Sequence, residues 1–529
     1  MAGTLKVPVT FSRWYNRAVT SPTRQITRAA GVVMATFVAS RLLGLVRDVV
    51  VSAHFGTSDA LDVYVAASRV NEIIFTLMAG GALASAFIPT FSSYLARNDE
   101  AGAWRLTSSV INLLLIALAI ASLLAAVFAP AIVATVLAPW FGPEKQSLTV
   151  VVMRWLLIAP TIFGVSGVVM GVLNARQQFW LPGIAPIMYN LAIMAGTIWL
   201  SPTWGINGLA IGAVAGAGLH LLVQMPGLIR LGARYTPRLS LRDPGVRQVL
   251  RLMAPRTLGL AVVQINFLVE TSLGSWLGTG VVSALNYAWR VMLLPQGVVA
   301  QSVAIAAFPT FADQFARGQF DQLRSALSAT LRAILFIAIP ASVGLLVLSA
   351  PLIQLLFERG EFQDTSTGLV ATALSFYALG LIGHSGVEIL TRAFYALHDT
   401  RTPVIFVVVS LGLNLILSLS LIGPLQIAGL ALANTLAALV EMILLAVTLR
   451  ARLGDLDDRR VIVATLKTLA ASLVMGFGVW GFLSLTSSAG VIVRGVGGML
   501  VGAVVFGGAA LALRVDELRS VIRIVKRNA

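Results

Sequence analysis

Residues 111–137 read INLLLIALAIASLLAAVFAPAIVATVL, a run that contains no charged side chain. A bilayer core of about 30 Å is crossed by roughly 20 apolar residues in a helix, so this run is long enough to span it. The rest of the chain has the same character, because 57% of its 529 residues are hydrophobic and only 11% are charged. The mean hydropathy is +0.88. The sequence therefore predicts an integral membrane protein.

Apolar runs of similar length recur along the chain, separated by polar, proline or glycine residues. The 14 runs cover residues 31–54, 63–92, 108–138, 147–175, 183–201, 206–230, 250–278, 282–312, 327–357, 367–397, 403–423, 426–449, 462–486 and 489–513. Backbone groups inside a bilayer must be hydrogen-bonded within the protein, and these runs are too long for the strands of a barrel. The predicted fold is an all-α polytopic membrane protein with 14 transmembrane helices.

Lysine and arginine are distributed unequally between the two sides of the membrane. If the N-terminus is cytoplasmic, 30 of the 38 basic residues lie on the cytoplasmic side, and the other side has only Lys145, Arg359 and Arg494. This bias predicts that both termini are cytoplasmic. Topology signals and anionic lipid headgroups also account for the net charge of +16, so we expect no nucleic-acid partner.

The residue inventory excludes several chemistries. The chain has no cysteine, and its four histidines do not follow a metal-binding spacing, so we expect no metal site. It also has no phosphate-binding loop and no soluble domain large enough to hydrolyse ATP. We therefore expect a transporter, not an enzyme, with no cofactor and an external energy source.

The chain contains an internal duplication. YVAASRV (64–70) and AFIPTFSSYLAR (86–97) match YAWRV (287–291) and AFPTFADQFAR (307–317), and Pro182 and Pro403 are separated by the same interval as Arg69 and Arg290. Six crossings separate the copies, so the repeat is parallel; transporters of this kind place the substrate path between their halves. A duplicated scaffold without a pathway is the alternative.

The duplication predicts how the chain is divided. The expected parts are a cytoplasmic basic arm (1–30), an N-lobe with the first six crossings (31–233), a cytoplasmic linker (234–249), a C-lobe with the next six (250–453), a C-terminal helix pair (454–513) and a basic cytoplasmic tail (514–529). The basic arm lacks the short apolar core of a signal peptide.

Charged residues inside the apolar runs are candidates for function, because each is costly in a bilayer. SRLLGLVRD (40–48) contains Arg41, Arg47 and Asp48. Either the aspartate pairs with one of the arginines and only holds helices together, or the surplus cation belongs to a binding site. Arg69 has Glu72 three residues further on, within reach of an ion pair, so structural and functional roles are equally open.

Arg290 has no acidic residue within one helical turn in the sequence. It is a candidate ligand for an anion, and clustered arginines match phosphate oxygens, so we expect a phosphate or pyrophosphate substrate. Glu270, in VVQINFLVETSLG (262–274), is a candidate site for coupling to a monovalent cation or a proton, with Asn414 and Asn434 as oxygen donors. Pairing of Glu270 with Arg290 or Arg41 is the alternative.

Four motifs occur in an order that matches a known family. They are SRLLGLVRD, GALASAFIPTF (81–91), LLFERGEF (355–362) and TRAFYALHDTRTP (391–403). On these motifs the chain resembles the MurJ/MviN lipid II flippases of the multidrug/oligosaccharidyl-lipid/polysaccharide exporter superfamily. The resemblance implies two lobes around a cationic cavity, and a groove for a polyprenyl tail at the last two helices. It also implies transport by alternating access of lipid II, the undecaprenyl-pyrophosphate-linked peptidoglycan precursor, from the inner to the outer leaflet of the bacterial cytoplasmic membrane.

The resemblance assigns the substrate-binding residues. Arg41, Arg47 and Asp48 match the charges of the first helix, Asp62 matches the acid that opens the second, and Arg290 matches the arginine of the eighth.

Two departures leave the expected site more apolar than is typical of the family. Phe75 stands where the family has an arginine, and Trp289 stands where it has an acid. Arg69, about two turns before Phe75, is a candidate replacement and is added to the substrate-binding set.

The resemblance also implies a monomer that works with the cell-wall synthesis machinery and is driven by the membrane potential or by ion coupling. Two other functions remain open at this point. One is a flippase or exporter for another polyprenyl-linked glycan or amphipathic compound, and the other is a cell-envelope scaffold that transports nothing.

Overall fold

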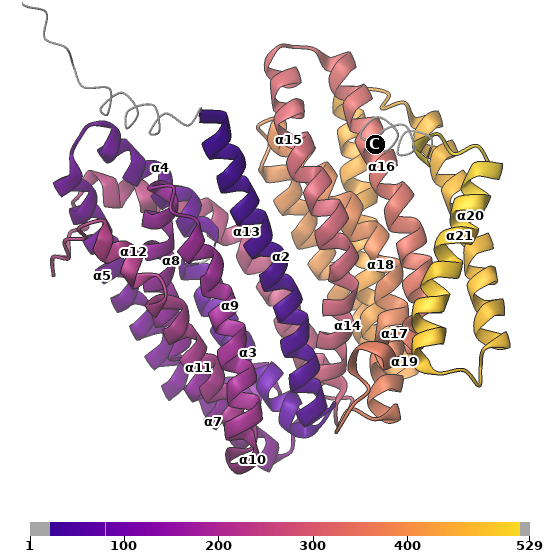
Figure 1. The fold of residues 1–529 in the computed structure, drawn as a ribbon, viewed down its shortest axis with the longest axis horizontal. Helices are drawn as coiled ribbons and strands as arrows, with labels where there is room; N and C mark the ends of the chain where they lie inside the picture. The colour runs from indigo at the N-terminus through magenta and orange to yellow at the C-terminus, as the bar shows by residue number, and fades with distance from the viewer. Residues whose placement is uncertain (1–21, 80, 238, 519–529) are drawn as a thin grey trace, which may run out of the picture. The chain divides into compact units, whose positions relative to one another are not determined.

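The structure is a computed structural model that describes residues 22–79, 81–237 and 239–518 (Figure 1). The regular structure in these ranges is helical throughout. Nine helical stretches in the described part of the chain are long and apolar enough to cross a membrane. One of them, Arg401–Leu453, consists of two helices that meet at a kink at Gln426. The prediction of an all-helical, multi-pass membrane protein is confirmed.

The described chain up to Arg230 forms thirteen helical elements, of which η1 and η2 are π-helical. Their bounds are α2 (Pro22–Phe55), α3 (Asp59–Ala79), α4 (Gly81–Ala96), α5 (Glu100–Val127), α6 (Ala129–Ile132), η1 (Val133–Leu137), α7 (Pro143–Leu156), α8 (Ala159–Ala175), α9 (Trp180–Ala195), η2 (Gly196–Leu200), α10 (Ser201–Trp204), α11 (Ile206–Leu222) and α12 (Met225–Arg230). The predicted arm 1–30 lies outside the described residues up to residue 21, and α2 begins within its remainder.

The later elements, from Pro244 onward, again include π-helical segments, η3 and η4. Their bounds are α13 (Pro244–Gly274), α14 (Val281–Pro295), η3 (Gln296–Ala300), α15 (Gln301–Ala316), α16 (Phe320–Val347), α17 (Ser349–Phe357), α18 (Asp364–Ala396), α19 (Arg401–Leu453), α20 (Asp458–Leu485), η4 (Val493–Gly497) and α21 (Gly498–Ala512). The predicted tail is described only as far as residue 518.

The helix boundaries repeat along the chain as the duplication requires. The number of residues from the start of α5 to the start of α16 equals the number from the end of α5 to the end of α16. In the same way, the number from the start of α7 to the start of α18 equals the number from the end of α8 to the end of α18. The backbone repeats as well: Gly205 has φ 54° and ψ −137°, and its counterpart Gln426 has φ 49° and ψ −127°. Glycine adopts a positive φ without strain, whereas a residue with a Cβ does not. The backbone of Gln426 is therefore strained at the position where the first copy of the repeat has a glycine.

Contacts divide the described residues into two compact units. Unit 1 consists of the described residues within 1–50, 71–126 and 154–257. Unit 2 consists of those within 51–70, 127–153 and 258–529. Unit 2 thus includes the end of α2 and the start of α3, together with most of the second half of the sequence. The lobe boundaries expected from the repeat stay a prediction.

Each unit has its own aromatic and aliphatic core. In unit 1, Phe87 and Phe91 of α4 pack with Trp104 of α5 and with Val172 of α8. In unit 2, the equivalent core contains Phe311 of α15, the counterpart of Phe91 in the repeated motif. The repeat therefore extends from helix boundaries to the side chains that fill the core.

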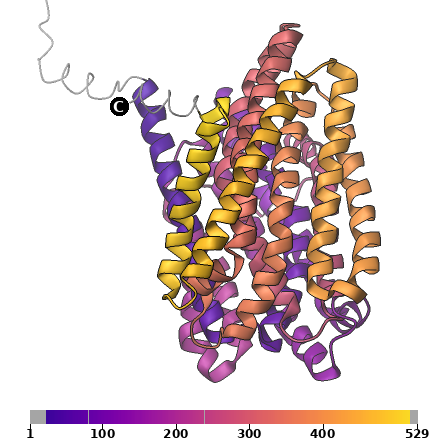
Figure 2. The same ribbon diagram turned by 90° about the vertical axis from the view of Figure 1, so that its right-hand side faces the viewer.

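Two features of unit 2 position its helices closely. A Cβ added at Gly383 of α18 would lie 2.8 Å from the backbone nitrogen of Leu439 on α19, so only glycine allows this approach. The C-terminal helices α20 and α21 (yellow) lie beside α16 in Figure 2, where Met475 of α20 packs in one cluster with Val343 of α16. Arg332 of α16 also forms an ion pair of 2.6 Å with Glu517, just after α21.

Candidate functional site

The charges of SRLLGLVRD lie on α2 in unit 1. Arg47 donates from Nε and Nη2 to Oδ1 of Asp48 (3.1 and 2.8 Å) and from Nη1 to Oδ1 of Asn190 on α9 (2.9 Å). Asn190 in turn donates to the carbonyl oxygen of Ser40 (3.4 Å). The side chains of Arg47 and Asp48 are only 18% and 14% exposed. Of the pairings left open by the sequence, the structure contains Arg47 with Asp48 and adds Asn190 as a second anchor.

Arg41 has a different environment from Arg47. Its side chain is exposed, and its guanidinium lies 5.2 Å from the ring centre of Phe37. The adjoining helices are close, because a Cβ at Gly183 of α9 would lie 2.4 Å from Oγ1 of Thr36 on α2. Two cations and one anion thus occupy this part of α2, and a positive charge remains accessible.

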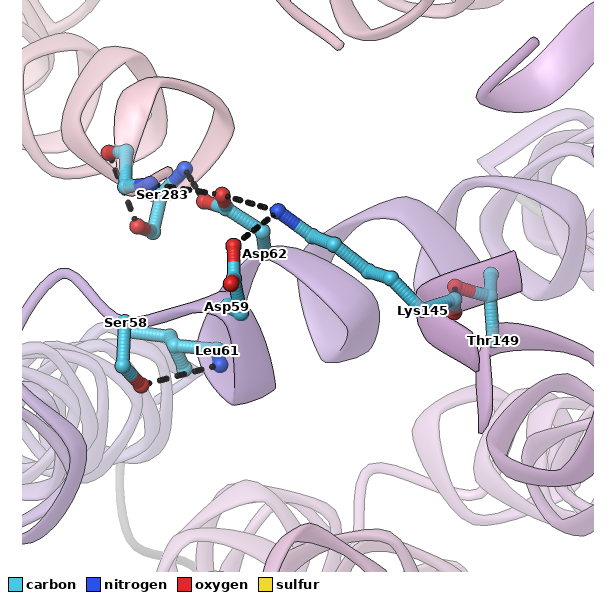
Figure 3. A network of polar contacts seen from close by, with 8 residues as sticks. Ser58, Asp59, Leu61, Asp62, Lys145, Thr149 and Ser283 are labelled. Carbon is cyan, nitrogen blue, oxygen red and sulfur yellow. Dashed lines mark hydrogen bonds and ion pairs between the residues drawn. The ribbon is translucent and has the colours of Figure 1, made fainter. Parts of the chain in front are cut away.

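A second group of charges lies at the start of α3 in unit 2 (Figure 3). Asp62 is completely buried: its Oδ1 accepts from the N–H of Ser283 (2.8 Å), and its Oδ2 accepts from the N–H of Gly280 (2.7 Å) and the ammonium of Lys145 (2.9 Å). Gly280 precedes α14 and has no side chain to cap it, so the first N–H groups of α14 need an outside acceptor. Asp62 supplies it, helped by the positive end of the helix dipole.

Asp59 and Asp62 share Lys145 but differ in their surroundings. The side chain of Asp59 is 57% exposed and that of Asp62 is 0% exposed. Burial raises the pKa of Asp59, but the hydrogen bond and charge of Lys145 outweigh it, so the pKa lies below the ordinary 3.8. The ammonium group of Lys145 also lies 3.9 Å from the ring centre of Phe141. Lys145 is therefore held between two acids and a ring.

Residues at and just after the end of α2 contact the loop before α18 and the first turn of α18. The hydroxyl of Thr57 lies 2.8 Å from Oγ of Ser366, and the N–H of Glu361 donates to the carbonyl oxygen of Ala53 (2.9 Å). A Cβ at Gly360 would lie 2.3 Å from that oxygen, so no larger residue fits. We call these contacts and those of Asp62 together the latch, which consists of Ala53, Thr57, Asp62, Lys145, Gly280, Ser283, Gly360, Glu361 and Ser366.

The latch relates equivalent positions of the repeat. Asp62 and Ser283 are separated by the same interval as Arg69 and Arg290, so their hydrogen bond joins a residue to its own counterpart. Trp140 and Glu361 are counterparts by the same interval. Glu361 contacts the end of α2, and Trp140 lies near Trp276 at the end of α13, with ring centres 6.0 Å apart. A contact between equivalent positions is isologous, as at a two-fold axis.

Arg69, further along α3, lies in a buried polar cluster of unit 2. Its Nε donates to Oγ1 of Thr271 (3.1 Å), and its guanidinium lies 5.1 Å from the ring centre of Phe267. Glu270, next to Thr271 on α13, accepts a short hydrogen bond from the hydroxyl of Tyr377 on α18. Arg69 also acts electrostatically on Glu270 and Tyr377. The structure thus brings Arg69 and Glu270, both predicted site residues, into one cluster.

Trp289 of α14 extends this cluster toward α19. Its ring centre lies 5.5 Å from that of Phe267, 5.5 Å from that of Tyr377 and 5.2 Å from that of His384. Nε2 of His384 lies 3.1 Å from Oδ1 of Asn434. We call Arg69, Phe267, Glu270, Thr271, Trp289, Tyr377, His384 and Asn434 the Arg69 cluster.

The remaining predicted residues lie outside the Arg69 cluster. Asn414 donates to Oδ1 of Asn266 (2.6 Å), and its own Oδ1 lies 3.3 Å from the hydroxyl of Ser418. The expectation that Asn414 and Asn434 together supply oxygen donors at Glu270 stays a prediction. Arg290 is half-buried and follows Trp289 on α14.

Sequence reasoning missed most residues of these networks, among them Asn190, Lys145, Tyr377 and His384. Lys145 is one of only three basic residues outside the predicted cytoplasmic and membrane segments, which was an available signal. Tyr377 and His384 are seven residues apart in one apolar run and so share a helix face. Nothing in the sequence pointed to Asn190.

Comparison with known proteins identifies the family. A family model described as "Lipid II flippase MurJ" matches residues 51–497. The chain belongs to the lipid II flippase MurJ family. A relative from Rhizobium meliloti named "Probable lipid II flippase MurJ" is 32% identical over 424 residues, which cover 78% of each chain. A relative of the same name from Haemophilus influenzae is 30% identical over 460 residues, or 84% of this chain and 90% of the other.

Solved structures agree with this assignment. A "Lipid II flippase MurJ, inward closed conformation" matches with a TM-score of 0.76 and 26% identity, covering 93% of this chain and 99% of that one. An inward-facing multidrug resistance MATE family transporter of the MOP superfamily matches with a TM-score of 0.68 at 17% identity, covering 79% of this chain and 96% of that one, a likeness of fold alone.

Phe75 and Trp289, the two positions at which the resemblance implies a charged residue, have clear places in the structure. Phe75 packs with the core of unit 1, its ring centre 5.4 Å from that of Phe163. Trp289 lies at the centre of the Arg69 cluster. Both aromatic side chains take part in ring contacts.

Proposed function

We propose that this protein is a lipid II flippase, which moves the undecaprenyl-pyrophosphate-linked peptidoglycan precursor from the inner to the outer leaflet of the bacterial cytoplasmic membrane. The family match over residues 51–497 is the observation that carries this proposal. The protein is a transporter and not an enzyme.

The proposed topology has 14 crossings with both termini in the cytoplasm. The unequal distribution of lysine and arginine supports it, because short cytoplasmic loops are enriched in these residues. In this topology Lys145 and the rest of the latch lie at the outer face. The proposed unit of function is a monomer that works with the cell-wall synthesis machinery.

The proposed mechanism is alternating access. A carrier of this kind must close one side while the other is open. The latch is a suitable closure for the outer side, because it joins residues of the first half of the sequence to residues of the second half by hydrogen bonds and an ion pair. Release of the latch would then open the outer side.

The proposed substrate contacts are the arginines. Arg41, Arg47 and Arg290 bind the pyrophosphate, because planar guanidinium groups pair well with phosphate oxygens. Asp48 positions Arg47, with which it is paired. The lipid tail stays in the bilayer, along the groove proposed for α20 and α21.

Asp62 and Arg69 complete the proposed substrate set. Both are engaged in this conformation, Asp62 in the latch and Arg69 with Thr271. They become available to a substrate only when those contacts open.

The proposed energy source is the membrane potential or a cation or proton bound at Glu270, with Asn414 and Asn434 as oxygen donors. No cofactor is part of the proposal. Glu270 is suited to this role because an ionisable residue inside the bilayer usually marks an ion or proton path.

Complementation tests the function. The wild-type gene should support growth of a bacterium depleted of its own lipid II flippase, and Arg290→Ala should not, because the pyrophosphate loses a ligand. Arg154→Ala is the matched control: this exposed arginine donates to the carbonyl oxygen of Ala126 and has no proposed substrate contact. Failure of a well-inserted wild type to complement would indicate another cargo. Complementation by variants that lack all three proposed arginines would show that these arginines are not the ligands of the pyrophosphate.

Cross-linking tests the mechanism. The chain has no cysteine, so Thr57→Cys with Ser366→Cys introduces one pair whose parent hydroxyls are 2.8 Å apart. Oxidation should lock the latch and stop complementation or flipping, and reduction should restore it. Each single-cysteine variant is the control. Full activity of the cross-linked protein would show that the latch does not open during transport.

A further inference from the structure

The latch and the Arg69 cluster are connected through one helix. Asp62 and Arg69 are seven residues apart on α3, two turns, so they lie on the same face. α14 also reaches both sites, because Gly280 and Ser283 of the latch lie at its start and Trp289 of the cluster lies further along it. Any movement of α3 or α14 at the cluster is therefore transmitted to the latch.

Two groups in the buried Arg69 cluster interact with the Glu270 carboxylate. The Tyr377 hydroxyl donates to its carboxylate, and Arg69 acts on it electrostatically. The side chains of Phe267 and Trp289, which pack edge to face in the same cluster, contain no oxygen that could bind a metal cation. A metal cation at this position would meet a guanidinium and a hydroxyl donor, whereas a proton needs only the carboxylate itself.

Other titratable or charged groups adjoin the cluster from each packed helix. α3 contributes Glu72, three residues after Arg69, and α14 contributes Arg290, next to Trp289. α18 contributes His384, whose ring packs edge to face with that of Trp289 and whose Nε2 faces Oδ1 of Asn434 on α19. Glu270 is the acid among them that accepts from Tyr377.

We propose that Glu270 is the proton-binding site of this transporter and that its protonation releases the latch. A proton from water adds to the Glu270 carboxylate and gives a neutral carboxylic acid. The attraction between Glu270 and Arg69 is then lost, α3 is held less firmly against α13, and the Asp62 end of the same helix moves away from α14. This inference rests on the proposed flippase function and specifies the ion to which it is coupled.

Latch closure can be measured without transport. The Thr57→Cys and Ser366→Cys pair should cross-link rapidly in alkaline buffer, and the yield should fall by about tenfold in mildly acidic buffer, within the range typical of coupled sites. In the Glu270→Gln background, which mimics the protonated acid, the yield should be low at every pH. Thiol reactivity changes with pH in both backgrounds alike, so their ratio reports the latch.

Glu441→Gln is the matched control. Glu441 is another membrane acid of unit 2, 8% exposed on α19, with the hydroxyl of Ser410 as its hydrogen-bond partner. We expect it to keep the pH response of the wild type. If Glu270→Gln keeps that response too, or if both variants lose it, Glu270 is not the proton site.

Flipping in proteoliposomes separates this inference from the proposed function. Fluorescent lipid II is followed at several pH values with and without sodium. The inference expects a pH-dependent rate that sodium does not change, and loss of that pH dependence in Glu270→Gln. Robust flipping that depends on sodium but not on pH would overturn the proton site alone. Absence of protein-dependent lipid II movement under all conditions would overturn the proposed function.

Discussion

Asp62 should contribute far more to the closed latch than Asp59, although both carboxylates contact Lys145. Asp62 is 0% exposed, whereas Asp59 is 57% exposed. The Asp62→Asn change keeps the shape of the side chain, removes its charge, and turns an amide donor toward either an N–H group or the Lys145 ammonium. Comparing Asp62→Asn with Asp59→Asn therefore shows how much a buried and an exposed carboxylate each contribute when both contact the same lysine.

The expected magnitudes follow from these surroundings. Asp62 accepts three hydrogen bonds of 2.7, 2.8 and 2.9 Å. Removing one partner of a buried ion pair costs about 3–5 kcal/mol, and each hydrogen bond to a charged group is worth about 1.5–3 kcal/mol. Since Asn keeps one acceptor, we expect about 3 kcal/mol, or roughly a hundredfold shift toward the open latch. Asp59→Asn should cost about 1 kcal/mol or less, as exposed pairs do.

The assay is disulfide formation between Thr57→Cys and Ser366→Cys at fixed pH, in otherwise wild-type, Asp59→Asn and Asp62→Asn proteins. We expect the rate to fall strongly only with Asp62→Asn, and Lys145→Met to have an intermediate effect because it leaves both amide donors of α14 in place. Equal rates for the two aspartate variants would refute the assignment of Asp62 as the cap of α14.

Three further predictions concern other parts of the chain. Gln426→Gly should raise the thermal stability of the purified protein by about 1 kcal/mol, since relief of a left-handed conformation outweighs the added chain entropy, and Gly205→Gln should lower it. Asn190→Leu should reduce complementation, because the Nη1 group of Arg47 loses its hydrogen-bond acceptor at a cost of about 1–3 kcal/mol. Asn190→Asp keeps an acceptor oxygen at this position and should not reduce complementation. Burial raises the pKa of Asp399, in the loop before α19, but hydrogen bonds from Thr402, Arg452 and the Arg401 N–H outweigh it and lower the pKa from 3.8 to about 2. The stability that Asp399 contributes is therefore full above about pH 4 and lost as the pH falls toward 2, a loss that thermal unfolding should show in the wild type and not in Asp399→Asn.

The sequence predicted features that depend on local pattern. Long apolar runs predicted the helices, and a few repeated landmarks predicted the offset that α18 follows and that α16 follows to within one residue. The kink at Gln426 was less visible, because glutamine is not one of the residue types that usually mark a left-handed turn.

The polar networks could be predicted only in part. Asp48 had two candidate partners, Arg41 and Arg47, and Asn190, 143 residues from Arg47, accepts a further hydrogen bond from the arginine that forms the pair. Lys145 lies 83 residues from Asp62, and the amide donors Gly280 and Ser283 lie 218 and 221 residues from it, so no spacing rule connects them. Pairing across the fold depends on how helices pack, which hydrophobic periodicity does not encode.

The contact between Asp62 and its own counterpart explains why the two copies had to diverge. In a dimer of identical halves, an acid at this position would face a second acid across the two-fold axis, and the two negative charges would repel each other. Within one chain, the second copy has serine at this position and offers backbone N–H groups to the remaining carboxylate. In a single chain the two copies can differ, so the carboxylate of one copy meets hydrogen-bond donors of the other. Two identical halves would instead place two carboxylates opposite each other.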